Sequence, residues 1–251
     1  MLLDLDHALP AAQASDRIAH QGFVVLTPGA LADLAGHRLA DLAALAPYWD
    51  DLPLDGYLRD RGRYRSRRHG CATFDLREGV LRPVPHRAHW QSTAYNALHG
   101  GLERWFEPLA AGMASAAVWV DLLGGLGRCF AAVRPPAGGR WFIEAHPFRI
   151  DTRDGVGRPT PEGAHRDGVD FVAVIIVRRH AISGGETRVF EAAGPRGVRF
   201  TLEAPWTAVL LDDTRMIHES TPIQSSGDEP GFRDTLVLTF RAGGFQAPPG
   251  A

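Results

Sequence analysis

The sequence predicts a mainly β protein of the barrel or jelly-roll class, with helical segments in its N-terminal part. Three short apolar runs rich in branched residues, at 171–177, 208–211 and 235–240, are typical of buried strands. A His-x-Asp pair precedes the first run, and a further histidine follows 53 residues later (218 − 165). If these side chains meet, a later strand must fold back beside the pair, as strands do in barrels and jelly rolls.

The N-terminal part is expected to combine one strand with helices. Residues 22–26 have the composition of a strand, and Thr27-Pro28-Gly29 forms a plausible helix entry. Leucines from Leu31 to Leu45 recur at the three-and-four spacing of an amphipathic helix. A second helical stretch, in two or three pieces, is predicted from about 90 to 118, where Gly and Pro interrupt the pattern.

The remaining chain is expected to form strands joined by turns. Besides the three apolar runs, strands are predicted at 126–133, 141–150 and 188–190. Gly184-Gly185 supplies a hairpin turn after the first apolar run, so the His-x-Asp pair would lie at the mouth of a hairpin. The Gly/Pro/Ala-rich tail at 243–251 is expected to be frayed.

Length and composition indicate one domain over residues 1–251, with a helical part at about 1–120 and a metal-binding core at about 125–242. The chain is 45% hydrophobic, which is enough to form a full core. Its net charge of −2 does not indicate binding to nucleic acid. Two cysteines, no targeting signal and no membrane-length apolar run predict a cytoplasmic protein without a membrane partner. The oligomeric state stays open.

His165, Asp167 and His218 are the candidate metal ligands. Side chains two positions apart on an extended chain point to the same side, so His165 and Asp167 can reach one ion together. Two imidazoles and one carboxylate on one face of an octahedron leave three positions open, as non-haem Fe(II) oxygenases require. With 11 histidines in the chain a lone His-x-Asp pair is chance-prone, and His218 alone could be a turn residue.

Arg233 and Thr235 are candidates for binding a carboxylate-bearing cosubstrate. Arg233 follows His218 by 15 residues (233 − 218) and begins the last predicted strand, and Thr235 faces the same way. A planar guanidinium binds a carboxylate through two parallel hydrogen bonds. Each residue alone could be an ordinary surface ion pair or strand residue, but the order of pair, Gly-Gly turn, histidine and arginine favours a site.

These motifs resemble those of the Fe(II)/2-oxoglutarate-dependent oxygenases, whose pattern is His-x-Asp, a distal His and Arg-x-Ser/Thr. The segment 161–171, Gly184-Gly185-Glu186-Thr187 and Thr221-Pro222-Ile223 are similar to the branch typified by isoleucine dioxygenase, which hydroxylates free amino acids. The resemblance implies a double-stranded β-helix, a distorted, cupin-like jelly roll with flanking helices. It also implies Fe(II), 2-oxoglutarate and O₂ as cofactors. Asp167 favours hydroxylation, since Ala or Gly at this position opens a halide site in related halogenases.

A free amino acid needs a cationic clamp for its carboxylate and an acceptor for its ammonium. Candidates near the expected barrel mouth are Arg65, Arg67 and Arg149 for the clamp, and Tyr64, Glu162 and Asp170, together with Glu144 and His146, for the amine. Each could equally form a structural ion pair or hydrogen bond.

Several alternatives remain open from the sequence. The substrate could be aliphatic, such as isoleucine or leucine, or cyclic, such as proline or pipecolate. A cupin-like metalloenzyme that does not use 2-oxoglutarate would keep the metal ligands without needing Arg233. A non-catalytic small-molecule-binding barrel is the third possibility.

Overall fold

The computed structural model describes residues 10–96 and 98–250, and residues 1–9 of the predicted domain lie outside this part. The strands are β1 (Phe23–Leu26), β2 (Arg65–Arg67), β3 (Gly70–Asp75), β4 (Val80–Pro83), β5 (Arg140–Asp151), β6 (Phe171–His180), β7 (Ile182–Gly184), β8 (Thr187–Glu191), β9 (Gly197–Phe200), β10 (Ala208–Asp212), β11 (Met216–Ser220), β12 (Ile223–Ser225) and β13 (Phe232–Arg241). The helices are η1 (Ala11–Gln13), α1 (Ala14–Gln21), α2 (Pro28–Ala35), α3 (Leu39–Ala43), η2 (Ala46–Trp49), α4 (Ala111–Ser115), α5 (Ala117–Val133) and η3 (Ala137–Gly139).

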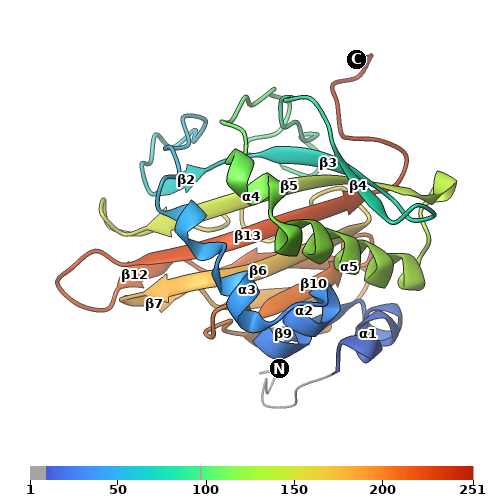
Figure 1. Ribbon diagram of the computed structural model, residues 1–251. Coiled ribbons are helices and arrows are strands. Elements are labelled where there is room, and N and C mark those ends of the chain that lie inside the picture. Colours follow the sequence, from blue (N-terminus) through green and yellow to red (C-terminus); the bar gives the residue numbers. More distant parts are fainter. Residues whose placement is uncertain (1–9, 97, 251) are drawn as a thin grey trace.

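One large antiparallel sheet forms the body of the molecule (Figure 1). Its strand order is β1-β10-β6-β13-β5-β3-β4, and β2 also pairs with β5. A smaller sheet has the order β11-β8-β9, and β12 pairs with β7. The mainly β fold with flanking helices is therefore confirmed, and it is a double-stranded β-helix of the jelly-roll type.

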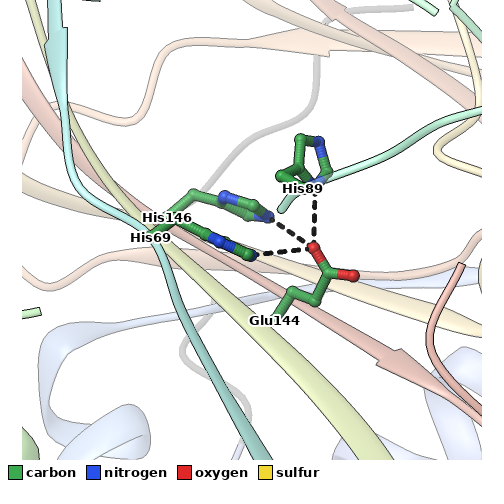
Figure 2. A group of neighbouring side chains, drawn as sticks. All are labelled: His69, His89, Glu144 and His146. Carbon is green, nitrogen blue, oxygen red and sulfur yellow. Dashed lines mark hydrogen bonds and ion pairs between the residues drawn. The ribbon is translucent and has the colours of Figure 1, made fainter. Parts of the chain in front are cut away.

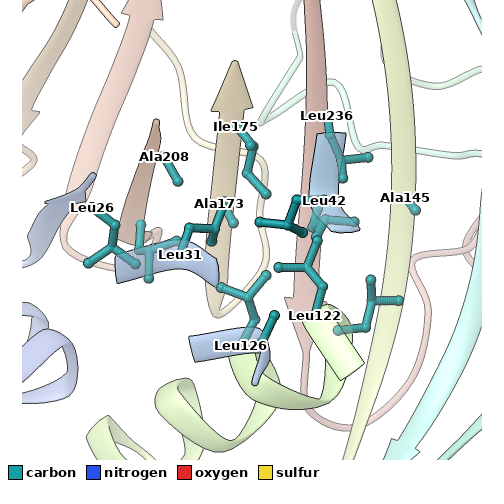
Figure 3. Close-up of a cluster of buried hydrophobic side chains, with 14 of the residues drawn as sticks. Leu26, Leu31, Leu42, Leu122, Leu126, Ala145, Ala173, Ile175, Ala208 and Leu236 are labelled. Atoms are coloured by element: carbon teal, nitrogen blue, oxygen red, sulfur yellow. The ribbon is translucent and has the colours of Figure 1, made fainter. Parts of the chain in front are cut away.

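Helices cover one face of the large sheet and the smaller sheet faces the other. Figure 3 shows Leu122 and Leu126 of α5 packed beside Ile175 of β6 and Leu236 of β13. A second apolar cluster, which includes Val172, lies on the opposite face of β6 and reaches the smaller sheet. Because β6 is buried on both faces, its sequence is apolar without alternation, as the run at 171–177 predicts.

Strands β5 and β13 carry alternating side chains to two different environments. On β5, Ile143 and Ala145 join the core under the helices, whereas Glu144 and His146 line a pocket between the sheets. The antiparallel register pairs Thr239 with Glu144, so the pocket-facing positions of the two strands lie side by side. This alternation decides which sequence candidates reach the site.

Two helical predictions are wrong in detail. The helix expected at 31–45 is two helices, because α2 ends at Ala35 and the following residue, Gly36, is in the left-handed region with φ 70°. The stretch expected from about 90 to 118 forms turns and isolated bridges as far as residue 110, and only α4 and the beginning of α5 are helical; residue 97 lies outside the described residues.

The strand predicted at 126–133 is instead the second half of α5. Leu122, Leu126 and Phe130 are fully buried at four-residue spacing and form one helix face. Gly125 is needed there because a Cβ would lie 2.2 Å from the carbonyl oxygen of Leu34. The glycines weaken the helical signal in the sequence while allowing close packing in the fold. Among the described residues, no helix is long and apolar enough to cross a membrane.

Candidate active site

His165, Asp167 and His218 are brought together and line the pocket between the sheets. His165 and Asp167 lie between β5 and β6, and His218 lies on β11. The backbones of His165 and His218 exchange two hydrogen bonds, of 3.0 and 2.9 Å. The expected return of a later strand beside the pair is therefore observed.

The ligand atoms of this trio converge. The carboxylate oxygens of Asp167 lie 3.8 Å from Nε2 of His165 and 3.7 Å from Nε2 of His218. Nδ1 of His165 lies 2.9 Å from the carbonyl oxygen of Gly163, and the tautomer that donates this bond leaves the Nε2 lone pair free. Ligands about 2.1 Å from one ion and at right angles to each other are about 3 Å apart, so closure by less than ~1 Å would fit a metal ion. The donor set of two imidazoles and one carboxylate suits iron.

The loop that carries Asp167 is held from several sides. The carboxylate of Asp213 accepts the backbone N–H groups of residues 167, 168 and 169 at 2.8–3.0 Å. The amide of Gln91 donates to Oδ1 of Asp167 at 3.2 Å, which orients this carboxylate. Gln246 donates to the carbonyl oxygen of Asp167 at 2.8 Å. The prediction of a frayed tail is therefore wrong for Gln246, because the loop holds its side chain.

Arg233 and Thr235 line the same pocket as the trio. Arg233 is 3% exposed, and within the described part of the chain it forms no ion pair: Nη2 donates weakly to the Ser220 hydroxyl at 3.4 Å, and Nε has no partner. Burial, assisted by the charge of Arg179, lowers the Arg233 pKa to about 9. A buried guanidinium without a counterion is suited to receive an anionic ligand.

Five of the eight predicted substrate residues line this pocket, namely Arg65, Arg67, Glu144, His146 and Glu162. Arg65 forms an ion pair of 2.7 Å with Asp55, so its charge is compensated. Oε1 of Glu162 lies 3.6 Å from Nε2 of His165, and its buried Oε2 has no partner among the described residues.

The other three have partners elsewhere and are not among the lining residues of the pocket. The side chain of Arg149 points to the same face of β5 as those of Ile143 and Ala145, away from the pocket, and forms an ion pair with Asp234 at 2.7 Å. Tyr64 donates its hydroxyl proton to Asp60 at 2.9 Å. Asp170 accepts the backbone N–H of residue 242 at 2.8 Å.

A second polar cluster consists of His69, His89, Glu144 and His146 (Figure 2). These four buried residues place one potential metal-ligand atom each within 4.8 Å of one another, so by distance they could also hold a metal ion. Oε2 of Glu144 lies 3.0 Å from Nε2 of His69, 2.6 Å from Nδ1 of His89 and 3.8 Å from Nε2 of His146. The other carboxylate oxygen points away from the three rings (Figure 2).

The charges of this cluster are set by burial and by mutual hydrogen bonds. Burial lowers the pKa of all three histidines, that of His89 to about 3, so the rings are neutral at pH 7. Burial opposes ionisation of Glu144 as well, but the contacts from His89 and His69 outweigh it and hold the pKa below its ordinary value. Glu144 is therefore an anion that accepts hydrogen bonds from neutral imidazoles.

Sequence reasoning missed four residues that surround the site: Gln91, His89, Arg104 and Asp213. Gln91 and Arg104 lie in the segment that was expected to be helical, and His89 directly precedes it; this part of the sequence has no periodic signal, and its described residues form turns. Asp213 follows the predicted strand at 208–211. A polar residue directly after a buried strand was the available signal for its role.

Comparison with known proteins identifies relatives over nearly the whole chain. The sequence profile described as 2OG-Fe dioxygenase matches residues 46–239. The crystal structure of a bsmA homolog from Methylobium petroleophilum PM1 is 60% identical, covers 99% of both chains and has a TM-score of 0.94. No curated protein matches the chain.

Two more distant structures share the fold. IDO from Bacillus thuringiensis is 13% identical, with a TM-score of 0.76 over 97% of this chain and 100% of the other. The Fe(II)/α-ketoglutarate-dependent dioxygenase TqaL is 17% identical, with a TM-score of 0.71 over 92% and 87%. At such identities the likeness is one of fold, so the isoleucine dioxygenase-like branch is not confirmed. The match over 46–239 spans most of the sequence, and the chain belongs to the 2OG-Fe dioxygenase family, which uses Fe(II), 2-oxoglutarate and O₂.

Proposed function

We propose that this protein hydroxylates a free L-amino acid, aliphatic or cyclic, within one oxygenase domain over residues 1–251. His165, Asp167 and His218 would hold Fe(II), and Arg233 and Thr235 would bind the distal carboxylate of 2-oxoglutarate. The observation that carries this proposal is the meeting of His165, Asp167 and His218 in one pocket with the buried Arg233, which forms no ion pair among the described residues. When bound, Fe(II), 2-oxoglutarate and O₂ supply the oxidant for C–H hydroxylation, and 2-oxoglutarate leaves as succinate and CO₂.

The protein's own residues perform binding and orientation. Asp213 holds the backbone of the Asp167 loop and Gln91 orients the Asp167 carboxylate, and the three proposed ligands all line the pocket. The guanidinium of Arg233 is already desolvated and gains a counterion when a carboxylate binds. The pocket lies between two sheets, and this enclosure limits the access of water to the reacting carbon.

A turnover panel tests the proposal. Anaerobically iron-loaded protein receives 2-oxoglutarate, O₂ and each common L-amino acid or cyclic imino acid, and mass spectrometry follows succinate and products with one added oxygen atom. We expect hydroxylated product and succinate in equal amounts with the correct substrate. Asp167→Ala should abolish both, whereas Asp154→Ala, at an exposed position outside the pocket, should retain them.

Other outcomes would support other functions. Product formation that persists without 2-oxoglutarate would favour a cupin-like metalloenzyme. Absence of succinate with every amino acid, despite bound iron and 2-oxoglutarate, would favour a binding barrel. Wild-type turnover by Asp167→Ala would remove this residue from the proposed ligand set.

A further inference from the structure

The pocket contains two more buried guanidiniums without a carboxylate partner in the described part of the chain, those of Arg67 and Arg104. The guanidinium carbon of Arg67 lies 3.8 and 4.3 Å from the ring centroids of Phe106 and Phe148, which fix its plane. Nη2 of Arg67 contacts Nδ1 of His146 at 2.6 Å. Nη2 of Arg104 donates to the Gln91 amide at 3.0 Å. Nε of each arginine has no hydrogen-bond partner among the described residues.

Among the described residues, Arg67 and Arg104 form no ion pair, whereas the neighbouring Arg65 does. Arg65 lies on the same wall and is paired with Asp55 at 2.7 Å. Burial lowers the pKa of Arg67 and of Arg104, the latter to about 10, and the positive charge of Arg65 lowers both pKa values further. Because an unpaired buried charge is costly, the pair is built to accept an anionic group. Arg233 is a separate cation on β13 and serves a different carboxylate.

Glu144 supplies the opposite charge on the same pocket wall. Its Oε2 receives hydrogen bonds from His69 and His89, which hold the carboxylate in place. Oε1 accepts no hydrogen bond within the described part of the chain and points away from the imidazoles (Figure 2). A fixed anion with one unused oxygen is suited to bind an ammonium group.

A metal ion in the cluster of His69, His89, Glu144 and His146 is less consistent with the hydrogen bonds. Arg67 can only donate, so Nδ1 of His146 must be the acceptor of their 2.6 Å contact. Neutral His146 then carries its proton on Nε2, the atom that faces Glu144, and offers no lone pair there to a metal. A divalent cation would also lie close to the positive charge of Arg67.

We propose that Arg67 and Arg104 bind the carboxylate of the substrate and that Glu144 binds its ammonium group, so that the pocket selects a zwitterion. This inference rests on the proposed function and names the groups that recognise the substrate. Gln91 joins the two parts of the site, since its amide accepts from Arg104 and donates to Asp167. A zwitterion held by this wall therefore lies one side chain away from a proposed iron ligand.

The first test uses the native protein and a matched series of ligands. Calorimetry measures binding of each common L-amino acid to the anaerobic Fe(II)·2-oxoglutarate complex. The tightest binder is then compared with its α-hydroxy acid, which lacks the ammonium, and with its amide, which lacks the carboxylate. We expect each loss to weaken binding by at least about 30-fold, as for removal of one partner of a buried charge pair.

Two variants then assign each charge to its residue. Glu144→Gln should reduce the preference for the amino acid over the α-hydroxy acid by at least about 10-fold, and Arg104→Met should do the same for the preference over the amide. Such ratios of two affinities do not change when a variant only loosens the fold. Arg149→Met removes an arginine from outside the pocket and should leave both ratios as in the native protein.

Each of the following results would contradict one of the proposed assignments. Equal binding of the amino acid and its α-hydroxy acid to the native protein would exclude Glu144 as the ammonium acceptor, and equal binding of the amide would exclude the arginine pair. If no amino acid binds although the Fe(II)·2-oxoglutarate complex forms, the zwitterion site is wrong and the cofactor assignment stands. If that complex does not form, the proposed function itself fails. A second metal equivalent that His89→Ala removes would assign the cluster to a metal.

Discussion

Replacing Arg233 by methionine should change cosubstrate affinity and apoprotein stability in opposite directions. In the proposed complex the Arg233 guanidinium forms a buried, bidentate pair with 2-oxoglutarate. Removing one partner of such a pair costs about 2–5 kcal/mol. At about 1.4 kcal/mol per tenfold change, the Kd for 2-oxoglutarate should rise roughly 30- to 4,000-fold.

Without 2-oxoglutarate the same substitution should stabilise the protein. Arg233 is 3% exposed, and among the described residues the only hydrogen bond of its guanidinium is the 3.4 Å contact to Ser220, so the desolvation of this charge is poorly compensated. Burial lowers the pKa of Arg233 to about 9. At pH 7, which is below its pKa in both the folded and the unfolded protein, Arg233 is charged in both states, so the whole free-energy cost of burying the charge reduces the stability. Even buried ion pairs can be replaced by well-packed apolar residues with no loss of stability or with a gain of about 1–4 kcal/mol, and Arg233 lacks a paired charge among the described residues. At roughly 2–4 °C per kcal/mol, the apoprotein Tm should rise by several degrees.

Anaerobic titration of the Fe(II) protein with 2-oxoglutarate, together with thermal melts of the apoprotein, measures both effects. Arg149→Met is the matched control, because this arginine donates two hydrogen bonds to the buried Asp234 at 2.7 and 2.8 Å, outside the pocket. It should lower the Tm and leave the 2-oxoglutarate affinity unchanged. An Arg233→Met protein that binds 2-oxoglutarate like the native one, or that loses as much stability as the control, would refute the reasoning.

Two further substitutions test the support of the site and of the fold. Gln91→Met should weaken Fe(II) or Co(II) binding by about 10- to 100-fold, because Asp167 loses an orienting hydrogen bond. Competition titration measures the metal affinity, and an unchanged affinity would contradict the orienting role of Gln91. Gly184→Ala should cost at least about 1–3 kcal/mol more than Gly79→Ala in denaturant unfolding. Both glycines have positive φ, but of the two only Gly184 would place a Cβ against a backbone atom, the carbonyl oxygen of Pro222 at 2.3 Å. Equal losses of unfolding free energy in the two variants would refute the steric argument.

The strands and the residues of the proposed iron site have local signals in the sequence. The apolar runs at 171–177, 208–211 and 235–240 lie within β6, β10 and β13. Side-chain alternation also placed Arg233 and Thr235 on one face. The same alternation on β5 places Arg149 and Glu144 on opposite faces of the sheet, so only Glu144 lines the pocket. Both were candidates for substrate binding because the alternation was not applied to this strand.

Helical boundaries were harder to predict, since packing overrides local preference. The glycines of α5 lower its helix propensity, yet Gly125 lets the helix approach Leu34 closely. The apolar residues at 90–110 are irregularly spaced. The described residues of this stretch form turns whose hydrogen bonds include partners distant in the chain, such as Tyr57 for Trp105. No short window of sequence contains those partners.

The sequence by itself determined the strand-rich core, the order of the three proposed iron ligands and the arginine on the last strand. These follow from the two-residue period of a strand and from residue chemistry, and both act over short distances along the chain. Only the tertiary structure decided which residues face the iron side across the pocket. Arg67, Arg104 and Glu144 come from segments far apart in sequence, and they become one charged wall only when β2, β5 and the turns at 90–110 pack together and exclude water from their charges.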